Sequence, residues 1–235
     1  MYSTSLLRFI AIIGAAAAQP SPITSWYTND TKGVATYYGT YGGNGACQLD
    51  QGNGVWVPKE IRNIDFTVAM NGPQYAAGAC GMCLRVTGSG KGKGLHPVVG
   101  TYYVYVNNLC PDCELGHLDF GNMVGDGLWD ISWRAIPCDA TLIKYRLIGH
   151  QWWFKVVPQA TRYPVRSFFI FHDGKWMRGQ KDDQQYYVFQ STKNIPFKFP
   201  MRVAYRSIYG QEIRDTIPSL RDFVTSNGKQ FPLRA

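Results

Sequence analysis

All six cysteines of this 235-residue chain lie between Cys47 and Cys138, and none follows Cys138. Six cysteines suffice for three disulfide bridges, which restrain only the part of the chain that they span. The sequence therefore predicts a first domain held by disulfides and a second domain without them.

Two Cys-x-x-Cys motifs raise alternatives to disulfides. Cys80-Gly-Met-Cys83 and Cys110-Pro-Asp-Cys113 are separated by 26 residues, a longer gap than that of common zinc ribbons. A thioredoxin-type redox pair is disfavoured because no βαβ pattern surrounds either motif. Export from the cell, which the N-terminus indicates, favours disulfides over metal ligands. We therefore expect disulfides and no metal site.

The N-terminus has the pattern of a secretory signal peptide. Arg8 supplies a positive charge, an apolar run follows over residues 9–18, and three alanines at 16–18 offer a cleavage site. The run is shorter than the roughly 20 residues that a membrane-spanning helix needs, and no later segment is longer. We expect residues 1–18 to be removed and the mature protein to be soluble and exported; the alternative is a buried N-terminal helix.

Short strand patterns fill the rest of the chain. The first half has four patterns rich in Val, Tyr and Thr, at 34–38, 64–68, 83–87 and 98–106, with Gly-rich runs at 39–45 and 88–94. The second half has seven more patterns with turn residues about every ten positions. Asp173-Gly174 predicts a tight hairpin. The fold class is therefore all-β, a small barrel over residues 27–139 and a β-sandwich over residues 140–235.

Charge divides the chain at the same place. Residues 19–139 contain seven Lys and Arg against ten Asp and Glu, whereas residues 140–235 contain sixteen against six. A strongly basic half indicates an acidic partner, either nucleic acid, anionic lipid or an acidic polysaccharide, unless it is simply a soluble basic surface. Export argues against nucleic acid.

The polar segment at residues 107–119 is the candidate chemical site of the first domain. Asp119 follows an apolar residue in a strand-like stretch, where a partly buried carboxyl group suits a general acid. Glycoside hydrolysis normally needs two carboxylates, and Asp112 and Glu114 lie on the nearby cysteine loop. The alternatives are that Asp119 only binds loop backbone, and that His117 either orients Asp119 or simply packs there.

An ordered set of motifs across both halves resembles the expansin family, most closely microbial expansin-like proteins. The motifs of the first half are Ala35-Thr36-Tyr37-Tyr38-Gly39, Gly45-Ala46-Cys47, Cys80-Gly81-Met82-Cys83, His117-Leu118-Asp119 and Trp133-Arg134. Those of the second half are Trp152-Trp153, Tyr163-Pro164-Val165, Asp173-Gly174-Lys175-Trp176 and Asp215-Thr216-Ile217-Pro218. The resemblance covers nearly all of the mature chain.

The resemblance implies a six-stranded double-psi β-barrel, similar to family 45 glycoside hydrolases, followed by an immunoglobulin-like domain that binds cellulose. Expansins loosen walls without hydrolysis, by disrupting noncovalent contacts between glucan chains. Asp119 matches the aspartate needed for loosening, which corresponds to the general acid of the hydrolases. The matched polysaccharide-binding positions are Thr36, Tyr38, Asn108, Trp152, Trp153 and Tyr186. The implied disulfides are Cys47–Cys80, Cys83–Cys138 and Cys110–Cys113.

Two departures from the family pattern bear on mechanism. The stretch around Thr36 and Tyr38 has no carboxylate to act as base, which argues against efficient hydrolysis because a general base is typically worth about 10²–10⁴-fold. Asn108 stands where many relatives have Asp, so less like-charge repulsion acts on Asp119 and its carboxyl group should ionise more readily.

Aromatic side chains supply the expected contacts to flat sugar faces. Trp152 and Trp153 are adjacent, so strict strand alternation would bury one of them, whereas the resemblance favours exposure of both. Trp133 and Trp176 are expected in the core or between the domains.

We therefore expect a secreted, extracellular, monomeric protein of the cell wall that is not an enzyme and needs no cofactor. Its expected partners are cellulose, xyloglucan or other β-glucans, and acidic pectin through the basic second domain; no nucleic acid and no membrane are expected. The alternatives are a weak lytic enzyme for β-glucan or peptidoglycan, and a pure binding protein for chitin or the producer's own wall.

Overall fold

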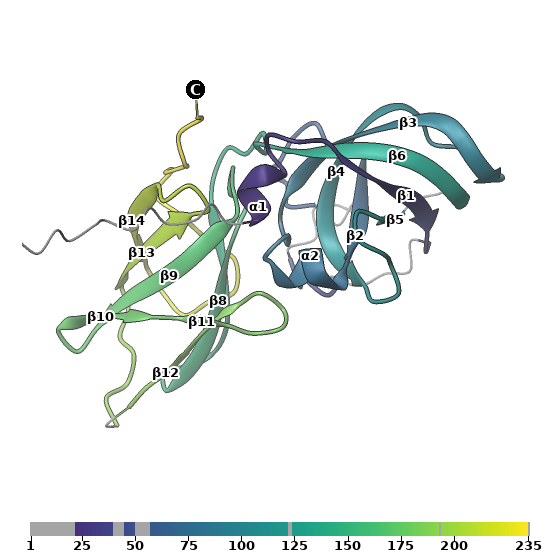
Figure 1. Ribbon diagram of the computed structural model, residues 1–235. Helices are drawn as coiled ribbons and strands as arrows, with labels where there is room; N and C mark the ends of the chain where they lie inside the picture. The colour runs from purple at the N-terminus through teal and green to yellow at the C-terminus, as the bar shows by residue number, and fades with distance from the viewer. Residues whose placement is uncertain (1–21, 40–44, 50–56, 122–123, 193, 235) are drawn as a thin grey trace, which may run out of the picture.

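The computed structural model describes residues 22–39, 45–49, 57–121, 124–192 and 194–234, so the predicted signal peptide lies outside the described residues. Within them the backbone is almost entirely β-structure, arranged as a closed barrel and two further sheets (Figure 1). The helices there are short, α1 over Pro22–Ser25 and α2 over Gly72–Ala76, and neither is long and apolar enough to cross a membrane. The predicted all-β fold is confirmed.

The first six strands close into a barrel. They are β1 (Thr31–Tyr37), β2 (Phe66–Asn71), β3 (Cys83–Gly94), β4 (Val99–Cys110), β5 (Leu118–Phe120) and β6 (Gly127–Ile136). Their order around the barrel is β1-β5-β2-β4-β3-β6, with β1 parallel to β5 and β2 parallel to β4. Alternate side chains fill the interior, among them the fully buried Leu84, Val104 and Phe120. This is the six-stranded double-psi barrel that the resemblance implied.

Strand β6 was not predicted from the sequence, although burial alternates along it. The predicted separating loop at residues 88–94 is wrong, because these residues form the second half of β3 and pair with β6. A Cβ atom at Gly92 would lie 2.1 Å from the carbonyl oxygen of Leu128, and one at Gly94 would lie 2.2 Å from that of Asp126. Glycine here permits close approach of two strands and does not mark a turn.

The remaining strands form a sandwich. They are β7 (Lys144–His150), β8 (Trp153–Gln159), β9 (Val165–His172), β10 (Lys175–Arg178), β11 (Gln180–Lys181), β12 (Tyr187–Gln190), β13 (Met201–Ser207), β14 (Glu212–Ile217) and β15 (Val224–Thr225). One sheet has the order β10-β9-β13-β14 and the other β11-β12-β8-β7-β15. Both sheets contribute to a core rich in aromatic rings, such as Phe154, Phe168 and Tyr205. The predicted immunoglobulin-like sandwich is confirmed, and Asp173 and Gly174 make the β9–β10 hairpin with positive φ angles of 48° and 74°.

Three disulfides stabilise the barrel half of the chain. They join Cys47 to Cys80, Cys83 to Cys138 and Cys110 to Cys113. These are the pairings that the resemblance implied. Because every cysteine is bonded to another, neither Cys-x-x-Cys motif offers the thiolates of a zinc site.

A third buried cluster lies between the barrel and the sandwich. Its members include Tyr75 of α2 and Val157 and Ala160 of the sandwich. Beside it Lys144 Nζ lies 3.0 Å from Glu60 Oε1, and both side chains are almost removed from solvent. Because a buried charge is costly without its partner, this ion pair favours one arrangement of the two domains.

The segment before β1 also joins the two domains, and Figure 1 shows α1 between them. Ile23 inserts into the sandwich core, where it is 2% exposed. Trp26 meets Trp133 of the barrel edge to face, with ring centroids 6.0 Å apart, while Tyr27 packs on Tyr163 of the sandwich at 5.7 Å. The segment that precedes β1 thus packs against the sandwich as well as against the barrel.

Replacing Ile23 by Ala should destabilise the protein by about 2–4 kcal/mol, because it removes a buried side chain and leaves a cavity in the sandwich core. The free energy of unfolding would be measured by urea titration followed by circular dichroism. Leu95→Ala is the matched control, since Leu95 is 80% exposed and its truncation should change stability by less than about 0.5 kcal/mol. Equal stability of the two variants would contradict the packing of α1.

Candidate functional site

Adjacent barrel strands place three of the predicted residues in one row. Thr36 of β1 pairs with Asp119 of β5, and Ala69 of β2 pairs with Asp119 on one side and with Asn108 of β4 on the other. The residues on either side of Asp119 lie in the barrel core, so the alternation of the strand directs the carboxyl group outward. We call Thr36, Tyr38, Asn108 and Asp119 the barrel site.

Asp119 is the acidic member of this site. The Thr36 hydroxyl donates a hydrogen bond to Asp119 Oδ1 at 2.5 Å. Partial burial raises the pKa of Asp119 above 3.8, and the hydrogen bond from Thr36 offsets part of that rise. One oxygen of the carboxyl group lies within 4.8 Å of sulfur atoms of the Cys110–Cys113 disulfide. The prediction from Asn108 compares Asp119 with relatives that have a second carboxylate at that position, and it stays a prediction.

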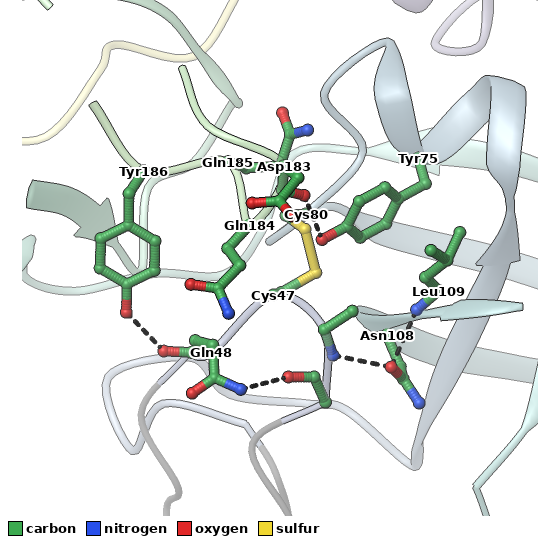
Figure 2. Close-up of a disulfide and its surroundings, with 12 residues drawn as sticks. Cys47, Gln48, Tyr75, Cys80, Asn108, Leu109, Asp183, Gln184, Gln185 and Tyr186 are labelled. Atoms are coloured by element: carbon green, nitrogen blue, oxygen red, sulfur yellow. Dashed lines mark hydrogen bonds between the residues drawn. A yellow bond between two sulfur atoms is a disulfide. The ribbon is translucent and has the colours of Figure 1, made fainter. Parts of the chain in front are cut away.

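Tyr38 and Asn108 connect the row to the loop at Ala46. Tyr38 forms side-chain hydrogen bonds with Asn108 and Thr67, and burial raises the pKa of its hydroxyl group. Asn108 Oδ1 accepts hydrogen bonds from the N–H groups of Ala46 at 2.7 Å and of Leu109 at 2.9 Å (Figure 2). Asn108 therefore positions the backbone at Ala46 and also lies in the same row as Asp119.

The other polar residues of this segment do not join Asp119. His117 Nε2 lies 3.8 Å from Glu114 Oε2, and Asp112 and Glu114 are exposed on the cysteine loop. Burial and the Thr36 hydroxyl are the influences on the pKa of Asp119, and no second carboxylate among the described residues contributes. The site offers a carboxyl group that can donate a proton or a hydrogen bond, but it lacks, in this part of the chain, a base to activate water.

Both tryptophans of the predicted platform reach the surface of the sandwich. Trp152 lies in the two-residue turn between β7 and β8 and is 39% exposed. Trp153 begins β8 and is partly exposed, whereas the next residue, Phe154, is fully buried in the core. The alternative that one tryptophan is a core residue is wrong, because the turn releases Trp152 from strand alternation.

Tyr186 is not part of an exposed platform, and that prediction is wrong. Its side chain is fully buried. Its hydroxyl donates to the carbonyl oxygen of Gln48 at 2.8 Å (Figure 2). Lys155 Nζ lies over its ring, 4.5 Å from the centroid. Arg146 also donates to the Gln48 carbonyl oxygen. The residue lies where the two domains meet, and its neighbour Tyr187 is buried as well.

These contacts form a continuous path between the two parts of the site. Trp153 and Lys155 are two residues apart on β8 and share its outer face. Lys155 covers Tyr186, Tyr186 binds Gln48, and Gln48 is two residues from Ala46, which Asn108 holds. The barrel site and the tryptophans are thus connected through one loop that the Cys47–Cys80 disulfide anchors.

The sequence does not reveal Gln48 and Arg146, because a backbone acceptor and a largely buried arginine leave no pattern. It placed Trp133 correctly in the core, where its indole donates to the carbonyl oxygen of Gly116 at 2.8 Å. It was wrong for Trp176, which is 39% exposed on the sandwich.

No protein-family model matches the chain. It is 29% identical over 218 residues to Expansin-YoaJ of Bacillus subtilis (strain 168), covering 88% of this chain and 86% of that protein. Two crystal structures of the Clavibacter michiganensis expansin share the fold, one of a mutant in complex with cellohexaose and one without ligand. Each has a TM-score of 0.68 and 24% identity, over 88% of this chain and 100% of the other.

Thr36→Val should raise the pKa of Asp119 further, because it removes the hydrogen bond that favours the charged carboxylate. Carbon-13 NMR titration of the Asp119 carboxyl group would measure the change. Thr87→Val is the control, since its hydroxyl contacts Thr101 and not the site. An unchanged or lower pKa in Thr36→Val would show that the hydrogen bond does not act on the charged form.

The similarity covers 88% of the chain, which is enough to include parts of both domains. This similarity agrees with the order of the motifs in the sequence, with the three disulfides and with the fold. Together these findings make the chain similar to bacterial expansins in sequence and in fold.

Proposed function

We propose that this protein binds cellulose and related β-glucans of cell walls and loosens them without hydrolysis. The observation that supports this most is the half-buried, outward-facing Asp119, connected through Gln48 to the exposed tryptophans of the sandwich. The similar expansin crystallised with cellohexaose supports a β-1,4-glucan as the ligand class. The ligand would extend from Trp152 and Trp153 to the barrel site.

Binding would rest on the tryptophans. A pyranose ring presents C–H bonds on a flat face, and an indole ring offers a large apolar area at low conformational cost. Trp152 is anchored at the hairpin, where its backbone N–H donates to His150 Nδ1 at 3.2 Å. Each tryptophan would stack on one sugar ring, and the small stacking energies of neighbouring sugars would add to the binding free energy. Xyloglucan has the same backbone and is included in this proposal.

Loosening would depend on Asp119. Glucan chains in a wall are held to one another by hydrogen bonds and stacking, and a carboxyl group with a raised pKa can exchange hydrogen bonds with sugar hydroxyls in both directions. Hydrolysis needs a second group to activate water. We therefore propose a non-enzymatic action in which Asp119 competes for contacts between glucan chains, with Thr36 fixing its orientation.

The cellular context is part of the same proposal. We propose removal of residues 1–18, secretion to the cell wall, action as a monomer, and domains at 27–139 and 140–235. Three disulfides are in keeping with an oxidising compartment outside the cell. The excess of basic residues after residue 139 would add attraction to acidic wall polymers such as pectin.

Trp152→Ala should weaken binding to microcrystalline cellulose about three- to tenfold, because one stacking surface is lost. Sedimentation of the protein with cellulose would measure the dissociation constant. Trp176→Ala is a closely matched control, since Trp176 has the same 39% exposure on another part of the sandwich, and it should bind cellulose as the wild type does. Equal losses in the two variants would contradict the proposed platform.

Asp119→Asn should abolish extension of a clamped, heat-inactivated plant wall strip under constant load, while cellulose binding stays within about twofold of wild type. Extension by the wild type should fall as pH rises through the raised pKa of Asp119, because the carboxyl group then loses its proton. Reducing ends are measured in the same assay. Their release in proportion to time and protein would indicate a lytic enzyme, and full activity of Asp119→Asn would overturn the assigned role.

A further inference from the structure

The Cys110–Cys113 disulfide differs from the other two in its exposure. Both ends of the Cys83–Cys138 bridge are buried, at 1% and 2% exposure, and Cys47 is fully buried in the Cys47–Cys80 bridge. Both cysteines of the Cys110–Cys113 bridge are partly exposed, and the two residues between them are exposed as well. A small molecule in solution can therefore reach this bridge more easily than the other two.

The same bridge contributes least to the stability of the fold. Its cysteines are 3 positions apart in the sequence, whereas the other pairs are 33 and 55 apart. A disulfide stabilises a protein mainly by restricting the unfolded chain, and this effect decreases with the length of the loop that the bridge closes. The Cys110–Cys113 bridge can therefore open while the fold persists.

Other contacts hold the chain on both sides of the bridge. Cys110 is the last residue of β4 and pairs with β2. On the far side of the loop, the Gly116 N–H donates to Gln74 Oε1 at 3.0 Å. The Gly116 carbonyl oxygen accepts a hydrogen bond from the buried indole of Trp133 at 2.8 Å. Opening the bridge would thus loosen the short loop between these two anchors and leave β4 and β5 in place.

Asp119 lies beside this bridge. One oxygen of its carboxyl group and the sulfur atoms of Cys110 and Cys113 all lie within 4.8 Å of one another. In the part of the chain that the structure describes, the carboxyl group accepts one side-chain hydrogen bond, from Thr36 at 2.5 Å. A disulfide has no proton to donate, whereas a thiol is a weak donor. Reduction would therefore place two new donors next to the carboxyl group.

No other titratable group near Asp119 changes its covalent state when the bridge opens. Tyr38 lies in the same site, and burial raises the pKa of its hydroxyl group, which keeps it neutral. Glu114 and His117 lie 3.8 Å apart on the loop, and Asp112 is exposed there. The two sulfur atoms are thus the groups through which reduction would act on the carboxyl group.

We propose that the Cys110–Cys113 disulfide is a site of reversible thiol–disulfide exchange, and that its redox state decides which hydrogen-bond donors surround Asp119. The reductant is a small thiol. Its thiolate forms a bond to one sulfur of the bridge, the S–S bond breaks, and the other cysteine leaves as a thiolate that takes up a proton from water. A second thiol then breaks the mixed disulfide. Two reagent thiols become one disulfide, and the two cysteines gain two electrons.

The first test is selective reduction of the full folded chain by dithiothreitol. Samples are quenched with iodoacetamide at successive times, and the alkylated cysteines are identified by peptide mass spectrometry. Cys110 and Cys113 should be alkylated at least about tenfold faster than the other four cysteines, because exposed bridges exchange more readily. Circular dichroism should show the fold intact at that stage. Simultaneous alkylation of Cys83 and Cys138, or no alkylation before unfolding, would overturn the exchange site.

The second test is carbon-13 NMR titration of the Asp119 carboxyl group in the oxidised and the selectively reduced protein. Its measured pKa should fall by about 0.5 on reduction, because thiol donors favour the charged carboxylate and stay protonated at acidic pH. The double variant Cys110→Ser/Cys113→Ser, which keeps donors and cannot form the bridge, should show the same fall.

The matched control is Cys110→Ala/Cys113→Ala, which opens the loop without supplying donors and should not lower the pKa of Asp119. An unchanged pKa in the reduced protein, or an equal fall in the alanine variant, would overturn the effect on Asp119. Neither test uses cellulose or a wall, so their failure would leave the proposed function standing. A protein that does not loosen walls would likewise leave the exchange site standing.

Discussion

The carbonyl oxygen of Gln48 is the acceptor on which the relation between the two domains depends. It receives hydrogen bonds from Tyr186 and from Arg146, both in the sandwich, while the preceding residue is fixed to α2's neighbourhood by the Cys47–Cys80 disulfide. A hydrogen bond of this kind is worth only about 0.5–1.5 kcal/mol net, but leaving a buried donor without its acceptor costs more. Because the Cys47–Cys80 disulfide already restrains the neighbouring residue, holding this carbonyl oxygen in place costs little further conformational entropy.

The same loop also serves the barrel site. Asn108 binds the backbone at Ala46 and hydrogen-bonds Tyr38, so the position of the site and the position of the sandwich are set by one short stretch of chain. The buried pair Lys144–Glu60 and the packing of α1 act at other points of the junction. A long ligand that contacts both domains needs such a fixed junction, because a mobile one would lose conformational freedom on binding.

The sandwich differs from the barrel in how it is stabilised and in what it presents. It has no disulfide, and its core contains many aromatic rings, including the stacked pair Phe168 and Tyr205. Its two outer faces have different chemistry: exposed indole rings at the β7–β8 hairpin, and arginines beside aromatic rings on β9, β10, β13 and β14. A β-sandwich allows this separation because alternate residues of each strand face core and solvent.

The sequence by itself determined the all-β class, the two halves, the β9–β10 hairpin and, through the expansin resemblance, the three disulfides and Asp119 in its site. These follow from local signals: strand alternation, turn residues and ordered motifs. Tertiary structure decided that Tyr186 is buried, that residues 88–94 are strand, that Trp176 is exposed, and that burial raises the pKa of Asp119. Each of these depends on which distant segment packs against the residue. Gln48 packs against Tyr186, and β6 packs against Gly92. The pattern of one strand does not contain that information.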